Sequence, residues 1–374
     1  MQYSGIPGNR PKSGARGSCA GDRFLTNRLG FGAVGCRERA HRLWLAAALL
    51  LIACVSFGQP APADVRGATR VVVISDLNES YGSVRYSPHV DAAVERTITL
   101  KPDLVISTGD MVAGQRLAPP LTRGQIEAMW VAFHRRVSDP VAKAGLPFAV
   151  TPGNHDASSG ERFRLEREIY REQWLPRKPA VEFLDATHYP FHYAFRVGDV
   201  LFVSLDATHV GHLSHAEKSW LQALLEGEGT RFRQRVVFSH VPLWPFAVGR
   251  EADFLGDHEL EKILQRGNVD LYLSGHHHAY YPGYKNGVRY VSQSCLGAAP
   301  RPLLGTTETH GRSITVIDLD ASGAIRVEAY GGPEFTRRIA RSALPARVES
   351  RWATILRDDL APAAAGRARV AEAR

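Results

Sequence analysis

The sequence of 374 residues is long enough for one large domain or two smaller ones, and its formal net charge is +8. Residues 1–63 hold eight Lys or Arg and two Asp or Glu, so the remainder, with 38 basic and 36 acidic residues, is nearly neutral. A nucleic-acid-binding domain needs clustered basic charge on its folded part, and the sequence after residue 63 shows no such cluster.

Residues 37–63 are predicted to be a secretory signal peptide. Arginines precede an apolar run over 43–55 that is too short for a comfortable membrane span, and Ala61-Pro62-Ala63 offers a cleavage site between small residues. Two alternatives stay open: lipidation of Cys54 and a single-span N-terminal anchor. All three place the following domain outside the cytoplasm, so we expect a periplasmic or secreted protein, with membrane attachment through this segment as an alternative.

The rest of the chain divides into three further regions. Residues 1–36 are rich in Gly, Arg and Ser and are interpreted as a flexible extension or as the product of a start codon assigned too early. Residues 64–335 are predicted to form the functional domain, and residues 336–374 a helical or disordered tail. Removal of the leader would leave Cys295 without a disulfide partner, so the domain must be stabilised by its core.

Five short runs rich in Val, Ile, Leu and Phe are predicted to be strands buried on both faces, and each leads into polar side chains. In chain order the runs and the residues that follow them are 70–75 before Asp76-Leu77-Asn78, 104–108 before Gly109-Asp110, 146–150 before Thr151-Pro152-Gly153-Asn154-His155-Asp156, 235–239 before His240, and 269–274 before Gly275-His276-His277-His278. Polar groups at the carboxyl edge of an open α/β sheet gather where ligands bind. Five such placements predict one metal site.

The remaining elements follow from periodicity and turn residues. Helices are expected over 88–100, 125–144 with an interruption near Pro140, 162–174, 214–225 with Ser214 as N-cap, and 259–265. Residues 178–189 are expected to be a loop insertion, and Asn286-Gly287 a two-residue hairpin turn. Hairpin strands over 193–196 and 200–205, and closing strands over 314–319 and 325–329, complete the pattern. It begins as β-α-β-α-β and ends in hairpins, which predicts an α/β fold with mixed strands.

The five motifs, taken in order, resemble those of the calcineurin-like metallophosphoesterase superfamily over about residues 71–278. Five spaced motifs in the same order are far more specific than any one of them. The resemblance implies a four-layer αββα sandwich of two mixed β-sheets flanked by helices. It also implies an enzyme that hydrolyses a small-molecule phosphomonoester or phosphodiester, by attack of a hydroxide that bridges two metal ions.

The resemblance also assigns residues to that site. Seven would bind the two ions: Asp110 as the bridge, Asp76, Asn78 and His278 on one ion, and Asn154, His240 and His276 on the other. Their nitrogen and oxygen atoms suit manganese, iron or zinc, as divalent or trivalent ions, better than calcium. His155 would hydrogen-bond or protonate the leaving oxygen, and Asp156 would orient its ring.

One position departs from the family pattern. Many members have His where this chain has Asn78, and an amide oxygen is a poorer donor. The alternative function is therefore a weakened metal- or phosphate-binding module of the same fold. A second alternative is an envelope-associated structural protein anchored through Cys54. Purple acid phosphatases have a Tyr ligand after the Gly-Asp motif, and Met111 follows it here, so that subclass is disfavoured.

Other side chains near the motifs have simpler interpretations. His277 is expected to point away from the metals, and Trp244 and Phe246 to pack a loop. The histidines at 209, 212 and 215 are interpreted as solvated or substrate-facing rather than as a metal cluster. Three tyrosines stand near motif ends, and the sequence does not select among them as pocket residues: Tyr81, Tyr280 and Tyr281.

Overall fold

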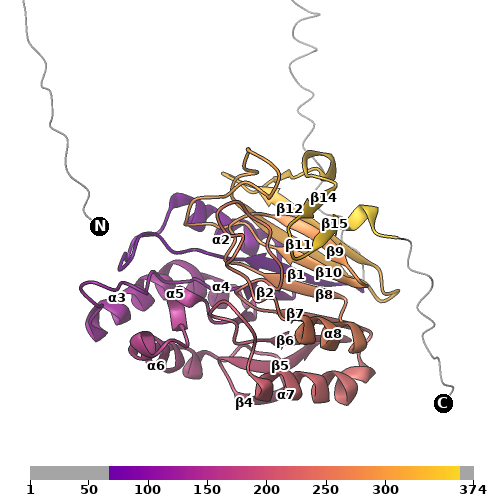
Figure 1. Cartoon of the computed structure of the whole chain (residues 1–374). Coiled ribbons are helices and arrows are strands. Elements are labelled where there is room, and N and C mark those ends of the chain that lie inside the picture. Colours follow the sequence, from indigo (N-terminus) through magenta and orange to yellow (C-terminus); the bar gives the residue numbers. More distant parts are fainter. Residues whose placement is uncertain (1–66, 363–374) are drawn as a thin grey trace, which may run out of the picture. The chain divides into compact units, whose positions relative to one another are not determined.

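A computed structural model describes residues 67–362 of the chain (Figure 1). The predicted extension, the predicted signal peptide and the residues after 362 lie outside this range. Within it, no helix is both long enough and apolar enough to cross a membrane.

The first sheet has six strands in the order β13-β12-β11-β1-β2-β3. Three are parallel and bear the first ligand motifs: β1 (Thr69–Ile74), β2 (Leu104–Ser107) and β3 (Phe148–Val150). The other three add antiparallel pairs: β11 (Ser313–Leu319), β12 (Ile325–Gly331) and β13 (Arg337–Arg338). The crossovers are α2 (Pro88–Leu100) and then α3 (Arg123–Phe133) with α4 (Asp139–Lys143).

The second sheet has nine strands in the order β14-β15-β9-β10-β8-β7-β6-β5-β4. Its parallel centre is β6 (Val200–Ser204), β7 (Gln234–Phe238), β8 (Leu271–Ser274) and β10 (Val288–Ser292). Antiparallel strands flank it: β4 (Glu182–His188), β5 (His192–Val197), β9 (Tyr281–Lys285), β14 (Arg347–Glu349) and β15 (Thr354–Arg357). The helices α7 (His215–Glu226) and α8 (His258–Arg266) connect its parallel strands and contact each other (Figure 1).

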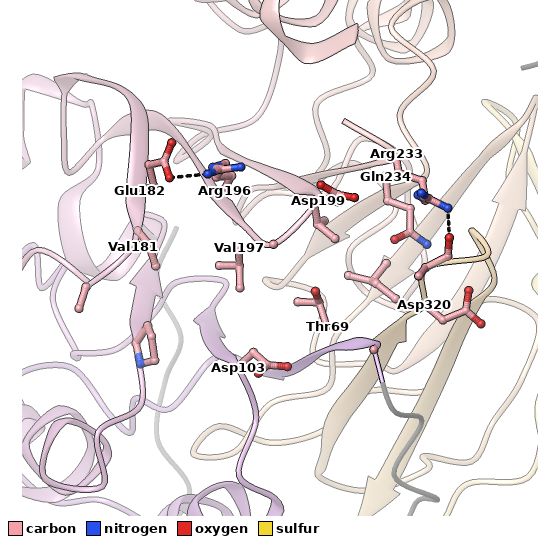
Figure 2. Close-up of a pocket in the computed structure, with 17 residues that line it drawn as sticks. Thr69, Asp103, Val181, Glu182, Arg196, Val197, Asp199, Arg233, Gln234 and Asp320 are labelled. Atoms are coloured by element: carbon pink, nitrogen blue, oxygen red, sulfur yellow. Dashed lines mark hydrogen bonds and ion pairs between the residues drawn. The ribbon is translucent and has the colours of Figure 1, made fainter. Parts of the chain in front are cut away.

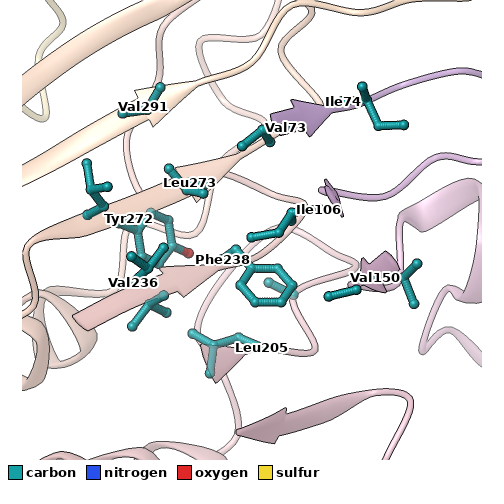
Figure 3. Close-up of a cluster of buried hydrophobic side chains, with 14 of the residues drawn as sticks. Val73, Ile74, Ile106, Val150, Leu205, Val236, Phe238, Tyr272, Leu273 and Val291 are labelled. Atoms are coloured by element: carbon teal, nitrogen blue, oxygen red, sulfur yellow. The ribbon is translucent and has the colours of Figure 1, made fainter. Parts of the chain in front are cut away.

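The two sheets share one buried apolar core. Figure 3 shows side chains of the first sheet, such as Val73 and Ile106, in one cluster with side chains of the second, such as Phe238 and Leu273. All four are fully buried. Burial on both faces explains why the parallel strands are continuous apolar runs rather than alternating ones. The predicted αββα architecture of two mixed sheets and flanking helices is confirmed.

Local sequence signals account for several element ends. The Ser214 hydroxyl accepts a hydrogen bond from the Glu217 N–H at 3.2 Å and caps α7, as predicted. Asn286 and Gly287 have φ values of 50° and 89°, the left-handed pair that a type I′ hairpin turn requires. The predicted helix over 125–144 is divided by a π-helical segment, His134–Ser138, just before Pro140, which has no N–H to continue the ladder.

Two segments differ from their predictions. Residues 178–189 contain β4, which pairs with β5 through a register shift, rather than a loop alone. The predicted tail from 336 is wrong for its first part, because β14 and β15 extend the edge of the second sheet. These two strands each bury one apolar side chain fully, Val348 and Ile355, and so short a pattern gives no periodic signal.

Candidate metal centre

The carboxyl ends of strands from both sheets meet at one edge and are joined there by hydrogen bonds. The His276 N–H donates to both oxygens of the Asp76 carboxylate, at 3.2 and 3.1 Å. The Gly275 N–H donates to the His240 carbonyl at 3.0 Å, and the Asp76 N–H to the Gly109 carbonyl at 3.0 Å. The motifs that the sequence placed at separate strand ends therefore form one continuous site.

The first group of predicted ligands surrounds His240. Its Nε2 lies 2.8 Å from Asn154 Oδ1 and 3.3 Å from Asp110 Oδ1. One ligand atom each from Asp110, His240 and His276 lies within 4.8 Å of the others, the one grouping of three such side chains found among residues 67–362. A carboxylate, an amide oxygen and two imidazoles at this separation are a donor set for one transition-metal ion.

The second group lies around Asp76. His278 Nε2 is 3.2 Å from Asp76 Oδ1, and the Ser75 hydroxyl donates to Asp76 Oδ2 at 2.6 Å. Asn78 is buried, and its backbone N–H donates to the Asp110 carbonyl at 3.2 Å. This bond ties the second group to the strand end that carries Asp110, the predicted bridging ligand.

The imidazoles of two predicted ligands are oriented by backbone carbonyls. His240 Nδ1 lies 2.8 Å from the Thr108 carbonyl, and His278 Nδ1 lies 3.1 Å from the Ala299 carbonyl. A carbonyl only accepts, so each Nδ1 carries the hydrogen and each Nε2 is directed toward the carboxylates. This is the arrangement that metal-binding histidines use to present one nitrogen.

Charged side chains in the site shift the pKa values of their neighbours. Burial alone would raise the pKa of the Asp110 carboxyl, but His240 and His155 outweigh it and hold that pKa well below its usual range. Burial opposes a charge on His240, yet the Asp110 carboxylate raises its pKa to about 9. Burial, reinforced by the charge on His240, lowers the pKa of His276. A neutral imidazole is the form that can bind a metal ion.

Four predicted ligands have strained backbone conformations. The φ values of Asp76, Asp110, His276 and His278 are 50°, 54°, 66° and 55°. Non-glycine residues rarely adopt positive φ, and such strain gathers at functional sites where the surrounding structure enforces it. The turn at each strand end therefore aims its side chain across the sheet edge instead of continuing the strand.

Glycine is required at three positions in the motifs, because a Cβ atom there would clash with neighbouring atoms. A Cβ on Gly153 would lie 2.1 Å from the Asp110 nitrogen and 2.2 Å from its Oδ1. A Cβ on Gly109 would lie 2.7 Å from His240 Nδ1, and one on Gly275 would lie 2.2 Å from the Ser75 hydroxyl. The glycines thus allow the ligand-bearing turns to approach one another as closely as the site requires.

His155 lies at the rim of this site and is half-buried. Its Nδ1 is 2.9 Å from the Gly114 carbonyl, and its backbone N–H donates to Asp110 Oδ1 at 2.9 Å. Its Nε2 is 3.9 Å from Asp110 Oδ2. The ring of Tyr81, an exposed residue, lies 5.3 Å from the His155 ring between centroids. Of the three tyrosines left undecided, Tyr280 and Tyr281 are buried, so Tyr81 is the one that borders the site on its open side.

The predicted role of Asp156 is wrong in one respect, because its carboxylate does not contact the ring of His155. It accepts hydrogen bonds from the N–H groups of Met111 at 2.7 Å, Val112 at 2.9 Å and Gly153 at 3.0 Å. Asp156 is the third residue of the short helix α5 (Asn154–Ala157), so its side chain turns back toward the helix start and is buried there. It holds the loop after Asp110 in place.

The positions of His277, Trp244 and Phe246 agree with their predictions. His277 faces away from the carboxylates, because its Nδ1 accepts from the Phe246 N–H at 3.0 Å and its Nε2 lies 2.8 Å from the Asp253 carbonyl. Trp244 and Phe246 are buried and pack the loop. The histidines at 209, 212 and 215 form no metal-binding group in the part of the chain that the structure describes.

Sequence reasoning missed two residues that contact this site or support it. Gln115 Oε1 accepts a hydrogen bond from Asn154 Nδ2 at 2.8 Å. The carboxylate of Glu166, on α6 (Arg164–Trp174), accepts from the Gln115 N–H, at 3.0 Å to each oxygen. A glutamine in a loop and one carboxylate on a strongly charged helix give no signal in a single sequence.

The chain is similar in sequence to known phosphoesterases and phosphatases. A family model described as calcineurin-like phosphoesterase matches residues 69–280. The bovine serine/threonine-protein phosphatase CPPED1 is 26% identical over 230 residues, which cover 58% of this chain and 64% of that protein. The Arabidopsis thaliana purple acid phosphatase 21 is 28% identical over 162 residues, which cover 41% of this chain and 35% of that protein.

Solved structures share the fold at low sequence identity. A dimetal phosphatase from Danio rerio superposes with a TM-score of 0.52 at 14% identity, covering 73% of this chain and 98% of that one. The purple acid phosphatase PPD1 from yellow lupin has the same TM-score at 16% identity, covering 71% of this chain and 51% of that one. The chain therefore spans slightly under two thirds of one curated relative and about one third of the other.

Proposed function

The chain belongs to the calcineurin-like phosphoesterase family, and we propose that it hydrolyses a small-molecule phosphomonoester or phosphodiester at a dinuclear metal centre. The observation that carries the proposal is the grouping of Asp110, His240 and His276, whose ligand atoms lie within 4.8 Å of one another, together with the neighbouring pair of Asp76 and His278. The Asp110 carboxylate lies 3.3 Å from His240 Nε2 on one side, while its main chain is bonded to Leu77 and Asn78 beside Asp76 on the other.

The donor set fits two transition-metal ions. One ion would be held by Asn154, His240 and His276, the other by Asp76, Asn78 and His278, with Asp110 shared between them. Imidazole nitrogens with carboxylate and amide oxygens favour manganese, iron or zinc. When bound, such ions stabilise charge on phosphoryl oxygens and activate water as a nucleophile.

The protein's own contribution to bond cleavage comes from His155. Its Nδ1 hydrogen is engaged by the Gly114 carbonyl, so the nitrogen on the side of the predicted ligands is Nε2, 3.9 Å from Asp110 Oδ2. To donate from Nε2 while Nδ1 is engaged, the ring must carry a hydrogen on both nitrogens. In this form His155 gives its Nε2 proton to the leaving oxygen of the ester.

The test of this function is turnover that depends on metal. The full chain is treated with a chelator, and hydrolysis of p-nitrophenyl phosphate and bis-p-nitrophenyl phosphate is measured before and after manganese, iron or zinc is returned. We expect activity to be lost and then restored, and the preferred substrate to separate monoesterase from diesterase. Metal binding without turnover of either ester would support the weakened binding module suggested by Asn78.

The proposal includes export from the cytoplasm, which is supported by sequence alone. The arginines before the apolar run over 43–55 and the small residues at 61–63 are typical of a signal peptide. Expression of the full chain in a bacterium, followed by N-terminal sequencing of the mature protein, tests it. Cleavage near residue 63 is expected, whereas a chain retained in the cytoplasm at full length would contradict export, and lipid on Cys54 would establish the anchored form.

A further inference from the structure

The turn formed by Gly114 and Gln115 contacts the site at two functional side chains. The Gly114 carbonyl engages His155 Nδ1 at 2.9 Å, and the Gly114 N–H donates to the His155 carbonyl at 3.1 Å. One residue later, Gln115 Oε1 accepts from Asn154 Nδ2 at 2.8 Å. A single turn therefore holds the predicted proton donor and the neighbouring predicted metal ligand.

The contact to Asn154 decides which of its amide atoms faces the ligands. An amide nitrogen only donates and an amide oxygen only accepts. Because Gln115 Oε1 takes the Nδ2 hydrogen, Oδ1 is left 2.8 Å from His240 Nε2, on the side of Asp110. Rotation of the amide by half a turn would present its nitrogen, which has no lone pair for a metal ion.

The turn is itself held in a demanding conformation. Gln115 has a φ of 67°, which a non-glycine residue adopts only when its surroundings enforce it. Glu166 supplies that constraint, since both of its oxygens accept the Gln115 N–H at 3.0 Å. Glu166 is buried and forms no ion pair among residues 67–362. A Cβ on Gly114 would lie 2.2 Å from the His155 carbonyl and 2.7 Å from Glu166 Oε2, so the turn fits closely between these partners.

We infer that Gln115 and Glu166 are positioning residues, which fix the Asn154 amide with its oxygen toward the metal ligands. Among residues 67–362, the hydrogen bonds of the Glu166 carboxylate go to Gln115, so we infer that Glu166 acts through Gln115. The inference rests on the proposed function in one respect, namely that Asn154 binds a metal ion. The orientation of the Asn154 amide can be measured whether or not a metal is bound.

The experiment compares three variants of the full chain with a control. Gln115→Leu removes the acceptor at similar size, Gln115→Glu keeps it, and Glu166→Leu removes the support beneath the turn. Gln222→Leu changes a glutamine on α7 that bonds only to Glu226 in the same helix, so it is the control. Zinc binding to the metal-free protein is measured by calorimetry, and the Asn154 side-chain amide is followed by NMR with asparagine labelled.

We expect Gln115→Leu and Glu166→Leu to weaken one of two zinc-binding events by about 10- to 100-fold, as removal of outer hydrogen bonds around a metal site does. Gln115→Glu should restore that affinity to within about threefold. In the metal-free protein, Gln115→Leu should shift the Asn154 amide signals and speed their hydrogen exchange. Gln222→Leu should change neither readout.

The outcomes separate the two claims. Unchanged Asn154 signals in Gln115→Leu, or equal losses of zinc affinity in Gln115→Glu and Gln115→Leu, would overturn the positioning role. A wild-type chain that binds none of zinc, manganese and iron, but whose Asn154 signals respond as expected, would overturn the proposed metal function and leave the network in place. Thermal unfolding of each metal-free variant identifies a general loss of folding. If Gln115→Leu does not fold, the zinc affinity of Gln115→Glu still tests the positioning role.

Discussion

The two edges of the same sheets differ in how deeply their side chains are buried and in the chemistry that these side chains bring together. The carboxyl edge holds the candidate metal centre, where buried carboxylates and imidazoles lie within hydrogen-bonding distance of one another. The opposite edge holds an open cavity of about 630 Å³ (Figure 2), which lies between the start of β1, the β5–β6 turn and the β11–β12 turn. None of the predicted metal ligands lies in the lining of this cavity.

Several charges at the opposite edge are paired with each other or with the main chain. Glu182 and Arg196 form an ion pair at 2.7 Å with side chains 60% and 43% exposed, so water screens it. Asp103 accepts from the Arg70 N–H at 2.7 Å, and Arg233 donates to the Ala321 carbonyl. We therefore place the candidate site by its converging, buried and strained side chains rather than by this cavity.

The largest effect is expected from Asp110→Ala at the carboxyl edge. The change removes the carboxylate that both ions would share. Metal-ion catalysis supplies several kcal/mol, and each 1.36 kcal/mol is a factor of ten, so kcat/KM should fall by at least about 10³-fold. Hydrolysis of both p-nitrophenyl esters and metal content check this. A variant that keeps full metal content and more than a tenth of the activity would contradict the shared-ligand role.

A smaller effect is expected from His155→Gln, which removes the proposed proton donor and leaves the predicted ligands in place. General acid catalysis contributes about 10²- to 10⁴-fold, so kcat for an alkyl phosphate should fall by at least about 10²-fold. Metal content should be unchanged. The loss should be much smaller for p-nitrophenyl phosphate, whose leaving group needs little protonation. Equal losses for both esters would show that His155 acts in some other way.

The steric basis of the motifs can be tested with two glycines. Gly153→Ala would place its Cβ 2.1 Å from the Asp110 backbone, and overpacking of this kind costs about 1–3 kcal/mol of unfolding free energy. Gly124→Ala, in α3, is the matched control, because its Cβ would meet nothing within 4 Å. The control should be neutral or stabilising by up to about 1 kcal/mol. Denaturant unfolding of the two variants measures the difference, and equal stabilities would contradict the packing argument.

The least effect is expected at the opposite edge. Glu182→Gln removes one charge of an exposed ion pair, and such pairs contribute about 0–1 kcal/mol to stability. Because this edge is predicted to take no part in the reaction, kcat/KM should stay within about twofold, a change of roughly 0.4 kcal/mol in the barrier. A large loss of activity in a well-folded Glu182→Gln protein would break the contrast between the two edges.

The carboxyl edge was predictable from the sequence to an unusual degree. Each ligand stands at a strand end next to a turn residue, so local patterns such as Gly109-Asp110 carry both the position and the chemistry. The sheets were predictable because buried parallel strands are continuous apolar runs. Both sources of information are local in the chain.

Features that depend on packing between distant segments were not predictable. Glu166 resembles any charge on an exposed helix until α6 places it under Gln115, 51 residues earlier. Asp156 was assigned to the His155 ring because the two are adjacent, but its partners Met111 and Val112 lie 45 and 44 residues away. Strands as short as β14 pair through their backbones and bury few side chains, so their sequence shows no period.

The most direct measurement is the number of metal ions bound per chain. The purified full chain is depleted of metal, reloaded with zinc or manganese and analysed for metal and protein, beside Asp110→Ala prepared in the same way. We expect about two ions per chain in the wild type, because the predicted ligands form two groups that are proposed to share Asp110, and fewer than one in the variant. One ion or none in the wild type would contradict the dinuclear centre.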